Sequence, residues 1–345
     1  MKAVLENIQS QLESAQGEVR RLFRRLEEQG PVRSCYEASS CGYALYRALD
    51  RDGFACEVVA PCLIPTLPGN RHKTDRSDAI NLAKLYRSGH LTPVHIPDEE
   101  QEAVRGLVRL RYTYQEQVKA TKQRICSFTY GKGHVFRETK TYWTRKHRAW
   151  LHGMRGSLPA AQSTVLGAEL EHLEYLESYV RSLDLEIDEY SRRSPYRNVV
   201  DGLCCMKGVK TLTAMILATE IGDIRRFPHP RALMAWCGLV PQERSSGARQ
   251  WRGPITKRGN RHVRRILVEA SWNHTRGDRP TCEIRRRRMG QDPAIVGIAV
   301  KAQQRLRKRV LRLGFRKHQN VAVTAVAREM CGFIWAIMRE VPQEA

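Results

Sequence analysis

The sequence predicts an α/β region followed by a mostly helical remainder, which we divide at residues 1–97, 98–197 and 198–345. Candidate strands and helices alternate near the N-terminus, which is typical of an α/β layer. Two long polar tracts with sparse apolar repeats follow, and they predict a helical arm. The last region is compact and strongly basic.

The N-terminal elements are short and separated by turn residues. They are, in order, a helix over residues 4–28, a strand over 32–37, a helix over 42–49 and a strand over 55–60. This β-α-β-α order favours parallel strands, whose functional side chains collect at their C-terminal ends. Glu37 occupies such an end.

Asp75 and Asp78 open the next candidate helix, between Lys73 and Arg76. Because they are three residues apart, both carboxylates share one face of the first helical turn. Oxygen ligands suit Mg²⁺, which is commonly held by one or two carboxylates together with substrate phosphates. The alternative is that the two aspartates only oppose the helix dipole.

The two polar tracts, residues 98–130 and 163–193, carry apolar repeats that predict an antiparallel coiled-coil arm, a device that usually serves assembly. Between them, residues 130–156 mix aromatic and basic side chains. This segment is either a surface on which bases stack or the tip of the arm packed on itself.

The charge balance indicates a polyanionic partner. The chain has 59 Lys and Arg against 36 Asp and Glu, a formal net charge of +23. Residues 201–345 contain 29 Lys and Arg against 11 Asp and Glu, an excess of 18 that makes this region the main electrostatic footprint. Nucleic acid is the first candidate, although structural RNA-binding proteins have the same balance.

Membrane insertion is not expected from the pattern. The apolar stretch over residues 321–338 is interrupted by Arg328 and Glu329, and the N-terminus lacks the apolar core of a signal peptide. We therefore expect a cytoplasmic protein.

Two segments of the C-terminal region could contact phosphates. Residues 206–214, with Lys207 and Lys210, resemble a helix-hairpin-helix, in which a glycine turn and a helix N-terminus present N–H groups. Further on, Ser245 and Ser246 precede Gly247 among many cations, so a serine hydroxyl could attack a phosphate that these cations hold. The cations are Arg244, Arg249, Arg252, Lys257, Arg258 and Arg261. Out of context, Ser-Ser-Gly is simply a turn.

Three blocks resemble the DEDD-type transposases, or RNA-guided recombinases, of the insertion-sequence 110 group. They are Tyr36-Glu37-Ala38, the segment 73–79, and the segment from Gly238-Leu239-Val240-Pro241 to Asn260. The resemblance implies an RNase H/RuvC-like N-terminal domain, a coiled-coil arm and a C-terminal transposase domain. It also implies a prokaryotic, nucleoid-associated enzyme that exchanges strands of donor and target DNA, uses Mg²⁺, is guided by a structured RNA and acts as a dimer or tetramer.

By resemblance, Glu37, Asp75 and Asp78 occupy the positions of three of the family's four metal ligands. Ser246, with Ser245 as the alternative, is similar to its nucleophile. The family's first aspartate lies on an opening strand of the type Val-Gly-Ile-Asp, and no segment before Glu37 has that pattern. We therefore expect a sheet that lacks its first strands and a metal site that lacks one carboxylate. The cause would be either a true start codon that lies upstream or decay of the element.

Two rival functions stay open at this point. One is a catalytically dead remnant that binds nucleic acid. The other is a RuvC-type junction nuclease, which needs carboxylates and metal but no serine.

Overall fold

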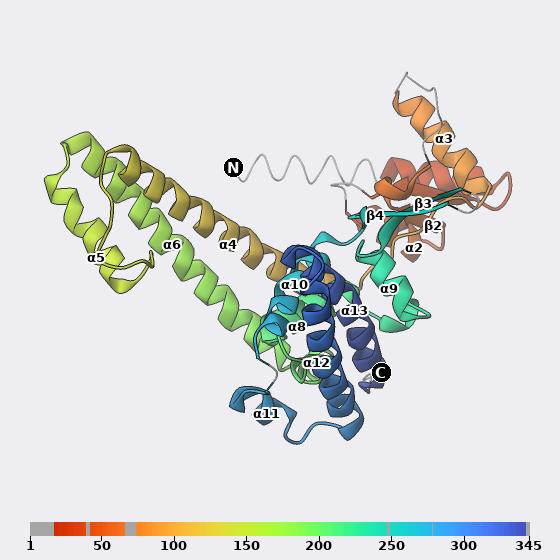
Figure 1. Cartoon of the computed structure of the whole chain (residues 1–345). Helices are drawn as coiled ribbons and strands as arrows, with labels where there is room; N and C mark the ends of the chain where they lie inside the picture. Colours follow the sequence, from red (N-terminus) through yellow and green to blue (C-terminus); the bar gives the residue numbers. More distant parts are fainter. Residues whose placement is uncertain (1–16, 39–41, 66–73, 247–248, 278, 343–345) are drawn as a thin grey trace. The chain divides into compact units, whose positions relative to one another are not determined.

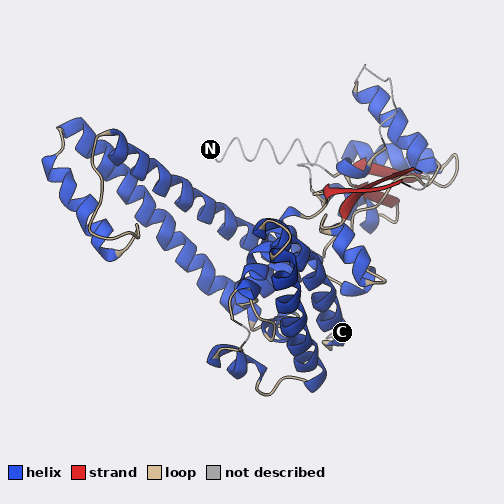
Figure 2. Cartoon of the chain, in the orientation of Figure 1, coloured by secondary structure: helices blue, strands red, loops and turns tan. Residues whose placement is uncertain are grey.

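The computed structural model describes residues 17–38, 42–65, 74–246, 249–277 and 279–342. The chain divides into two compact units, Met1–Asp98 and Glu99–Ala345 (Figure 1). Helices dominate the described residues, and the strands form two small sheets of two strands each (Figure 2).

The first unit contains the predicted β-α-β-α order. Its elements are β1 (Arg33–Glu37), α2 (Ala44–Arg51), β2 (Ala55–Val59), the short 3₁₀ turn η1 (Pro61–Leu63) and α3 (Asp75–Arg87). Strands β1 and β2 pair in parallel, with Arg33 opposite Ala55 and Glu37 opposite Val59. The predicted alternation and the parallel pairing are both confirmed. Of the N-terminal helix expected over residues 4–28, residues 17–27 are helical and residues 4–16 lie outside the described part.

Among the described residues of this unit, Phe23, Leu49 and Phe54 form a buried cluster. The rings of Phe23 and Phe54 meet edge to face with centroids 5.2 Å apart. This cluster packs the N-terminal helix against α2 and the start of β2.

The second unit begins with α4 (Glu99–Gly131), and α6 (Ala160–Ser191) packs along it. Arg111 near the start of α4 pairs with Asp184 near the end of α6, whereas Arg124 pairs with Glu169. This order of partners requires the two helices to run antiparallel, as predicted. Their supercoiling into a coiled coil stays a prediction.

The end of this helical pair is closed by α5 (Arg145–Met154) and the short 3₁₀ turn η2 (Arg155–Ser157), and its aromatic residues pack on one another. Phe136 and His147 are 4% and 1% exposed, and their rings are 4.9 Å apart. The backbone N–H of Trp143 donates to His147 Nδ1 at 3.0 Å. Burial, together with the nearby Arg148, lowers the pKa of His147. For these residues, the structure favours packing of the tip on itself over a base-stacking surface.

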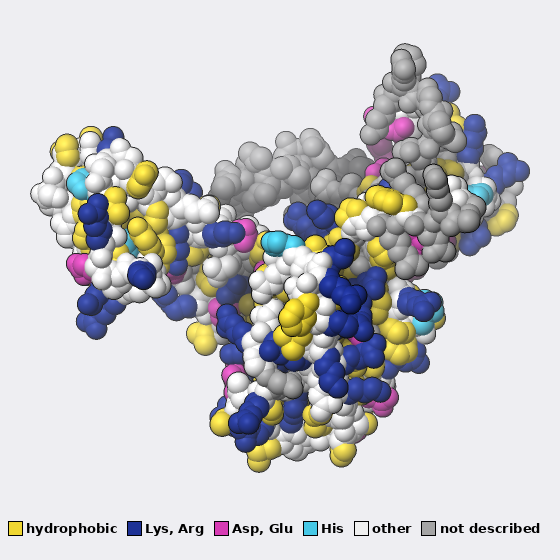
Figure 3. Space-filling view, in the orientation of Figure 1, with side chains coloured by type: hydrophobic (Ala, Val, Ile, Leu, Met, Phe, Trp, Pro, Cys, Tyr) yellow, Lys and Arg dark blue, Asp and Glu magenta, His cyan; other side chains and the backbone are white. Residues whose placement is uncertain are grey.

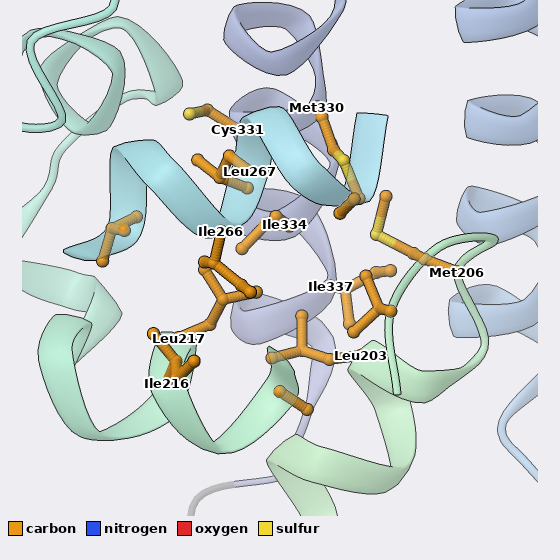
Figure 4. Packing of buried hydrophobic residues seen from close by; sticks show 14 of the residues in the cluster. Leu203, Met206, Ile216, Leu217, Ile266, Leu267, Met330, Cys331, Ile334 and Ile337 are labelled. Carbon is orange, nitrogen blue, oxygen red and sulfur yellow. The ribbon is translucent and has the colours of Figure 1, made fainter. Parts of the chain in front are cut away.

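The rest of the unit is a helical core with one hairpin. Its elements are α7 (Tyr196–Cys204), α8 (Thr211–Ile221), η3 (Ile224–Arg226), α9 (Pro230–Trp236), β3 (Pro241–Ser246), β4 (Arg249–Ile255), α10 (Arg261–Ser271), η4 (Trp272–Thr275), α11 (Cys282–Arg288), α12 (Pro293–Gly314) and α13 (Gln319–Glu340). Leu217, Leu267 and Ile334 lie in the large cluster where α8, α10 and α13 meet (Figure 4).

Helix α13 is the one helix of the described part that is long and apolar enough to cross a membrane, judged by length and composition. Half of its apolar window is buried inside the protein. Met330 and Ile334 belong to the buried cluster, so α13 has the packing of a core helix.

Candidate functional site

The serine block forms one end of a two-stranded hairpin. Strands β3 and β4 are antiparallel, with Pro241 opposite Ile255 at the base and Ser246 opposite Arg249 at the far end. Ser246 is exposed and is the last residue of β3. Residues 247–248, which follow it, lie outside the described part. The hairpin thus presents Ser246 at its end rather than burying it in a turn. The register places the other predicted residues of this block, Arg244, Ser245 and Arg252, along the same two strands.

Two glycines fix the base of this hairpin. Gly238 and Gly259 have φ values of +66° and +109°, which favour glycine. A Cβ at Gly259 would lie 2.0 Å from the carbonyl oxygen of Trp236, and a Cβ at Gly238 would lie 2.3 Å from that of Arg258. The two backbone segments therefore cross at a distance that only glycine permits.

Backbone hydrogen bonds join the same two segments. The N–H groups of Lys257 and Asn260 donate to the carbonyl oxygens of Gly238 and Trp236 at 3.1 and 3.0 Å. The family-like blocks before and after the serines are thus one structural unit, which explains why both contain glycine.

Asn260 links this unit to the helical core. Its side-chain oxygen accepts from the N–H groups of His262 and Val263 and so caps α10, while its amide nitrogen donates to Glu220 at 2.7 Å. Glu220, on α8, is 4% exposed and also receives Arg109 of α4 in a two-pronged pair at 2.6 and 2.7 Å. The base of the hairpin is therefore tied to α8 and to α4.

The electrostatics of this network follow from burial and pairing. Burial alone raises the pKa of the Glu220 carboxyl, but hydrogen bonds from Arg109 and Asn260 outweigh it and hold that pKa below its ordinary value. Burial lowers the pKa of the neighbouring His262, and Glu220 only partly opposes this effect. At neutral pH the carboxylate is charged and the imidazole is neutral.

Sequence reasoning missed Glu220 and Arg109. The available signal was a single acidic residue inside the apolar helix 211–221, because a buried carboxylate needs a partner. Nothing in the sequence pointed to Arg109, which lies 111 residues before Glu220.

The predicted phosphate-binding turn is packed against the protein. Gly208 has φ +88°, and a Cβ there would lie 2.4 Å from the carbonyl oxygen of Ala270. Lys207 donates through Nζ to the carbonyl oxygen of Arg276 at 2.9 Å, and the exposed Lys210 pairs with Glu283 at 3.4 Å. This side of the turn thus has a structural role, which the helix-hairpin-helix interpretation did not anticipate.

The remaining predicted cations lie close to the hairpin or near α3. Lys257, Arg258 and Arg261 are exposed and follow β4 directly. Arg76 is exposed on α3, and Lys73 lies outside the described residues.

The three predicted carboxylates occupy the elements that the sequence indicated. Glu37 ends β1, and Asp75 and Asp78 lie in the first turn of α3, all three exposed. Helix α3 packs against β1, yet within the described ranges no three His, Cys, Asp or Glu side chains are grouped so that they could hold a metal. Convergence of all three carboxylates on one ion therefore stays a prediction.

Asp75 and Asp78 nevertheless remain a pair that could hold a cation. Thr74 caps α3 by accepting the N–H of Ser77 at 3.2 Å, and the Ser77 hydroxyl completes the capping box. Since Thr74 and Ser77 do the capping, neither aspartate is consumed by it. Two carboxylates on one helical face suit a Mg²⁺ whose other ligands are water and phosphate.

Two family models match parts of this chain. Residues 3–129 match a family model for transposases of the DEDD IS110 type, and residues 201–283 match the model described as the transposase IS116/IS110/IS902 family. The first match contains the three carboxylates, and the second contains the serine hairpin.

Two similar proteins support the match over most of the chain. A putative transposase, y4qE, of Sinorhizobium fredii is 39% identical over 96% of this chain and 82% of its own length. The transposase for insertion sequence element IS1533 of Leptospira borgpetersenii is 31% identical over 87% of this chain and 88% of its own.

Proposed function

The chain belongs to the IS116/IS110/IS902 family of transposases, and on this premise we propose that it cleaves and exchanges DNA strands through a covalent bond to Ser246. Family membership makes it a transposase of an IS110-family insertion sequence, which acts on DNA, and implies a RuvC/RNase H-like fold for the DEDD region. The serine chemistry, the metal and the guide RNA are the proposed part.

The observation that carries the proposal is an exposed serine at the end of a firmly anchored hairpin. Covalent catalysis requires a nucleophile held at a fixed place, and the crossing of Gly238 and Gly259 supplies a rigid base. We assign the attack to Ser246, whose side chain is exposed at the end of β3, and Ser245 is the alternative.

The proposed reaction is a pair of phosphoryl transfers. The Ser246 oxygen bonds to phosphorus, the bond from phosphorus to a deoxyribose oxygen breaks, and the serine proton passes to the departing oxygen. A deoxyribose hydroxyl of the exchanged strand then attacks the same phosphorus, and the serine oxygen leaves and regains a proton. The exposed cations Lys257 and Arg258 would neutralise the charge that develops on the phosphate.

A divalent ion fits this proposal through the carboxylate pair. Asp75 and Asp78 would hold Mg²⁺, which when bound would supply charge neutralisation at the scissile phosphate. Glu37, exposed at the end of β1, is the third carboxylate that the family resemblance assigns to this site, and its participation is part of the proposal.

The proposed partners follow from the family resemblance and the charge. A structured RNA from the element would pair with donor and target DNA, and the excess of 18 positive charges in residues 201–345 would bind both polymers. A dimer or tetramer would be assembled through the arm of α4 and α6.

A strand-cleavage assay tests the proposal. The full chain, Mg²⁺, the element's RNA and labelled donor DNA should give a protein–DNA adduct that survives denaturation. Ser246→Ala should abolish the adduct, while Ser245→Ala should retain it. Loss of the adduct in Ser245→Ala alone would move the nucleophile by one residue.

The same assay separates the two rivals. Binding of DNA with neither cleavage nor adduct would indicate a catalytically dead remnant. Metal-dependent cleavage of DNA junctions without an adduct would indicate a RuvC-type nuclease.

A further inference from the structure

We propose that a phosphodiester backbone lies in a basic groove along α12 that leads to the base of the serine hairpin. Helix α12 has Lys301, Arg305, Lys308 and Arg312 at spacings of four, three and four residues. These spacings place all four on one face of the helix. At about 1.5 Å per residue, the stripe is about 16 Å long.

The four residues of this basic stripe line one hollow, and one of them, Arg305, also lines a second hollow. One has a volume of about 550 Å³ and contains the four stripe residues. The other, of about 700 Å³, extends to Val240 and Pro241 at the start of β3. Arg305, Arg309 and Glu329 line both, so the two hollows form one groove.

The charge of the groove calls for an extended anion. Its walls contain seven Lys and Arg against two Glu. Figure 3 shows Lys and Arg side chains gathered over the face of the helical unit that α12 and α13 form. Clustered cations repel one another, so the groove gains stability from an anion that neutralises several of them at once. A single phosphate would reach only one or two of the stripe residues.

One carboxylate, Glu329, pairs with one residue of the stripe and leaves the other three available. Glu329 of α13 pairs with Arg305 and, at 2.9 Å, with Arg309, and its side chain is 16% exposed. Lys301, Lys308 and Arg312, by contrast, form no ion pair with any residue that the structure describes, and all three are exposed. They are the groups that would bind phosphates.

Strand β3 connects the end of the groove at Pro241 to Ser246. From Pro241 to Ser246, β3 advances by five residues, about 16 Å at about 3.3 Å per residue. Phosphates of one duplex strand are about 3.4 Å apart along the axis, so a strand that runs parallel to β3 would contact the groove about five nucleotides from the phosphate at Ser246. This distance rests on the proposed chemistry at Ser246, whereas binding in the groove does not.

A salt titration tests the groove independently of that chemistry. Binding of the full chain, in the Ser246→Ala background, is measured against duplex DNA and against RNA of equal length over a range of KCl concentrations. The groove variant is Lys308→Ala/Arg312→Ala. The matched control is Arg285→Ala/Arg286→Ala, which removes the same charge from exposed positions on α11.

The groove variant should bind more weakly and lower the slope of log affinity against log salt by about 2 for duplex DNA, since each phosphate contact contributes about 0.9. The control should change the slope by clearly less. The melting temperatures of both variants should equal that of the native protein. The polymer whose slope falls more is the one that occupies the groove. An unchanged slope for both polymers, or an equal loss in the control, would overturn the proposal. A failure of serine chemistry would leave this result unaffected.

Discussion

Asn260 donates its side-chain amide to Glu220 at 2.7 Å, and this bond joins the loop behind the serine hairpin to a carboxylate buried in α8. The same carboxylate holds Arg109 of α4. A change in α4 can therefore reach the base of the hairpin through two side-chain contacts.

We expect Glu220→Ala to lower the free energy of unfolding by about 2–3 kcal/mol. The substitution leaves Asn260 without its acceptor and Arg109 without its partner, but Arg109 is 43% exposed and is partly solvated. Urea unfolding at neutral pH measures the change. Arg124→Ala, which breaks the more exposed pair with Glu169, is the control and should cost under about 1 kcal/mol. Equal losses would contradict a special role for Glu220.

The cost of Glu220→Gln should depend on pH. The folded-state pKa of Glu220 is held below its ordinary value, so its contribution is fully present above the unfolded-state pKa and is lost as pH falls through the folded one. The stability gap between native and variant should therefore be constant from neutral pH to about 5 and shrink below about 4. A gap that grows on acidification would show that the pKa is raised instead.

Gly259→Ala should be far more damaging than Gly290→Ala. Both glycines have positive φ, +109° and +76°, but a Cβ at Gly259 would lie 2.0 Å from Trp236 whereas nothing lies within 4 Å at Gly290. We expect about 1 kcal/mol of destabilisation for Gly290→Ala and at least about 3 kcal/mol for Gly259→Ala. Thermal unfolding of both variants gives the comparison. Similar melting temperatures would mean that the crossing is looser than described.

Asp75→Asn and Asp78→Asn should abolish strand cleavage while changing stability by less than about 1 kcal/mol. Both side chains are exposed and the cap of α3 comes from Thr74 and Ser77, so the loss would be one of metal binding. Cleavage is measured as a function of Mg²⁺ concentration, with a chelator giving the value without metal. This measurement distinguishes a loss of metal binding from a loss of stability. Full activity of Asp78→Asn at ordinary Mg²⁺ concentrations would remove this residue from the site.

Much of the secondary structure could be predicted from local sequence patterns, because strands, helices and caps depend on residues that are close in sequence. The strand 33–37, the strand 55–59 and the helix starting at Asp75 follow from alternation and capping, and the long helices α4 and α6 follow from their apolar repeats. The serine block was recognised by its residues, but only a turn was considered there and not the two strands of the hairpin.

Relations between distant residues were not predictable in the same way. The pair of Arg109 and Glu220 depends on how α4 packs on α8, and the burial of His147 depends on how the aromatic tip folds back.

The most direct test of the central claim is to identify the residue that becomes joined to DNA. The full chain is allowed to react with donor DNA, Mg²⁺ and the element's RNA, is denatured and digested, and the DNA-linked peptide is analysed by mass spectrometry. We expect a phosphodiester link between the DNA and the side-chain oxygen of Ser246. A link on any other residue, or strand exchange that proceeds with no linked peptide, would contradict it.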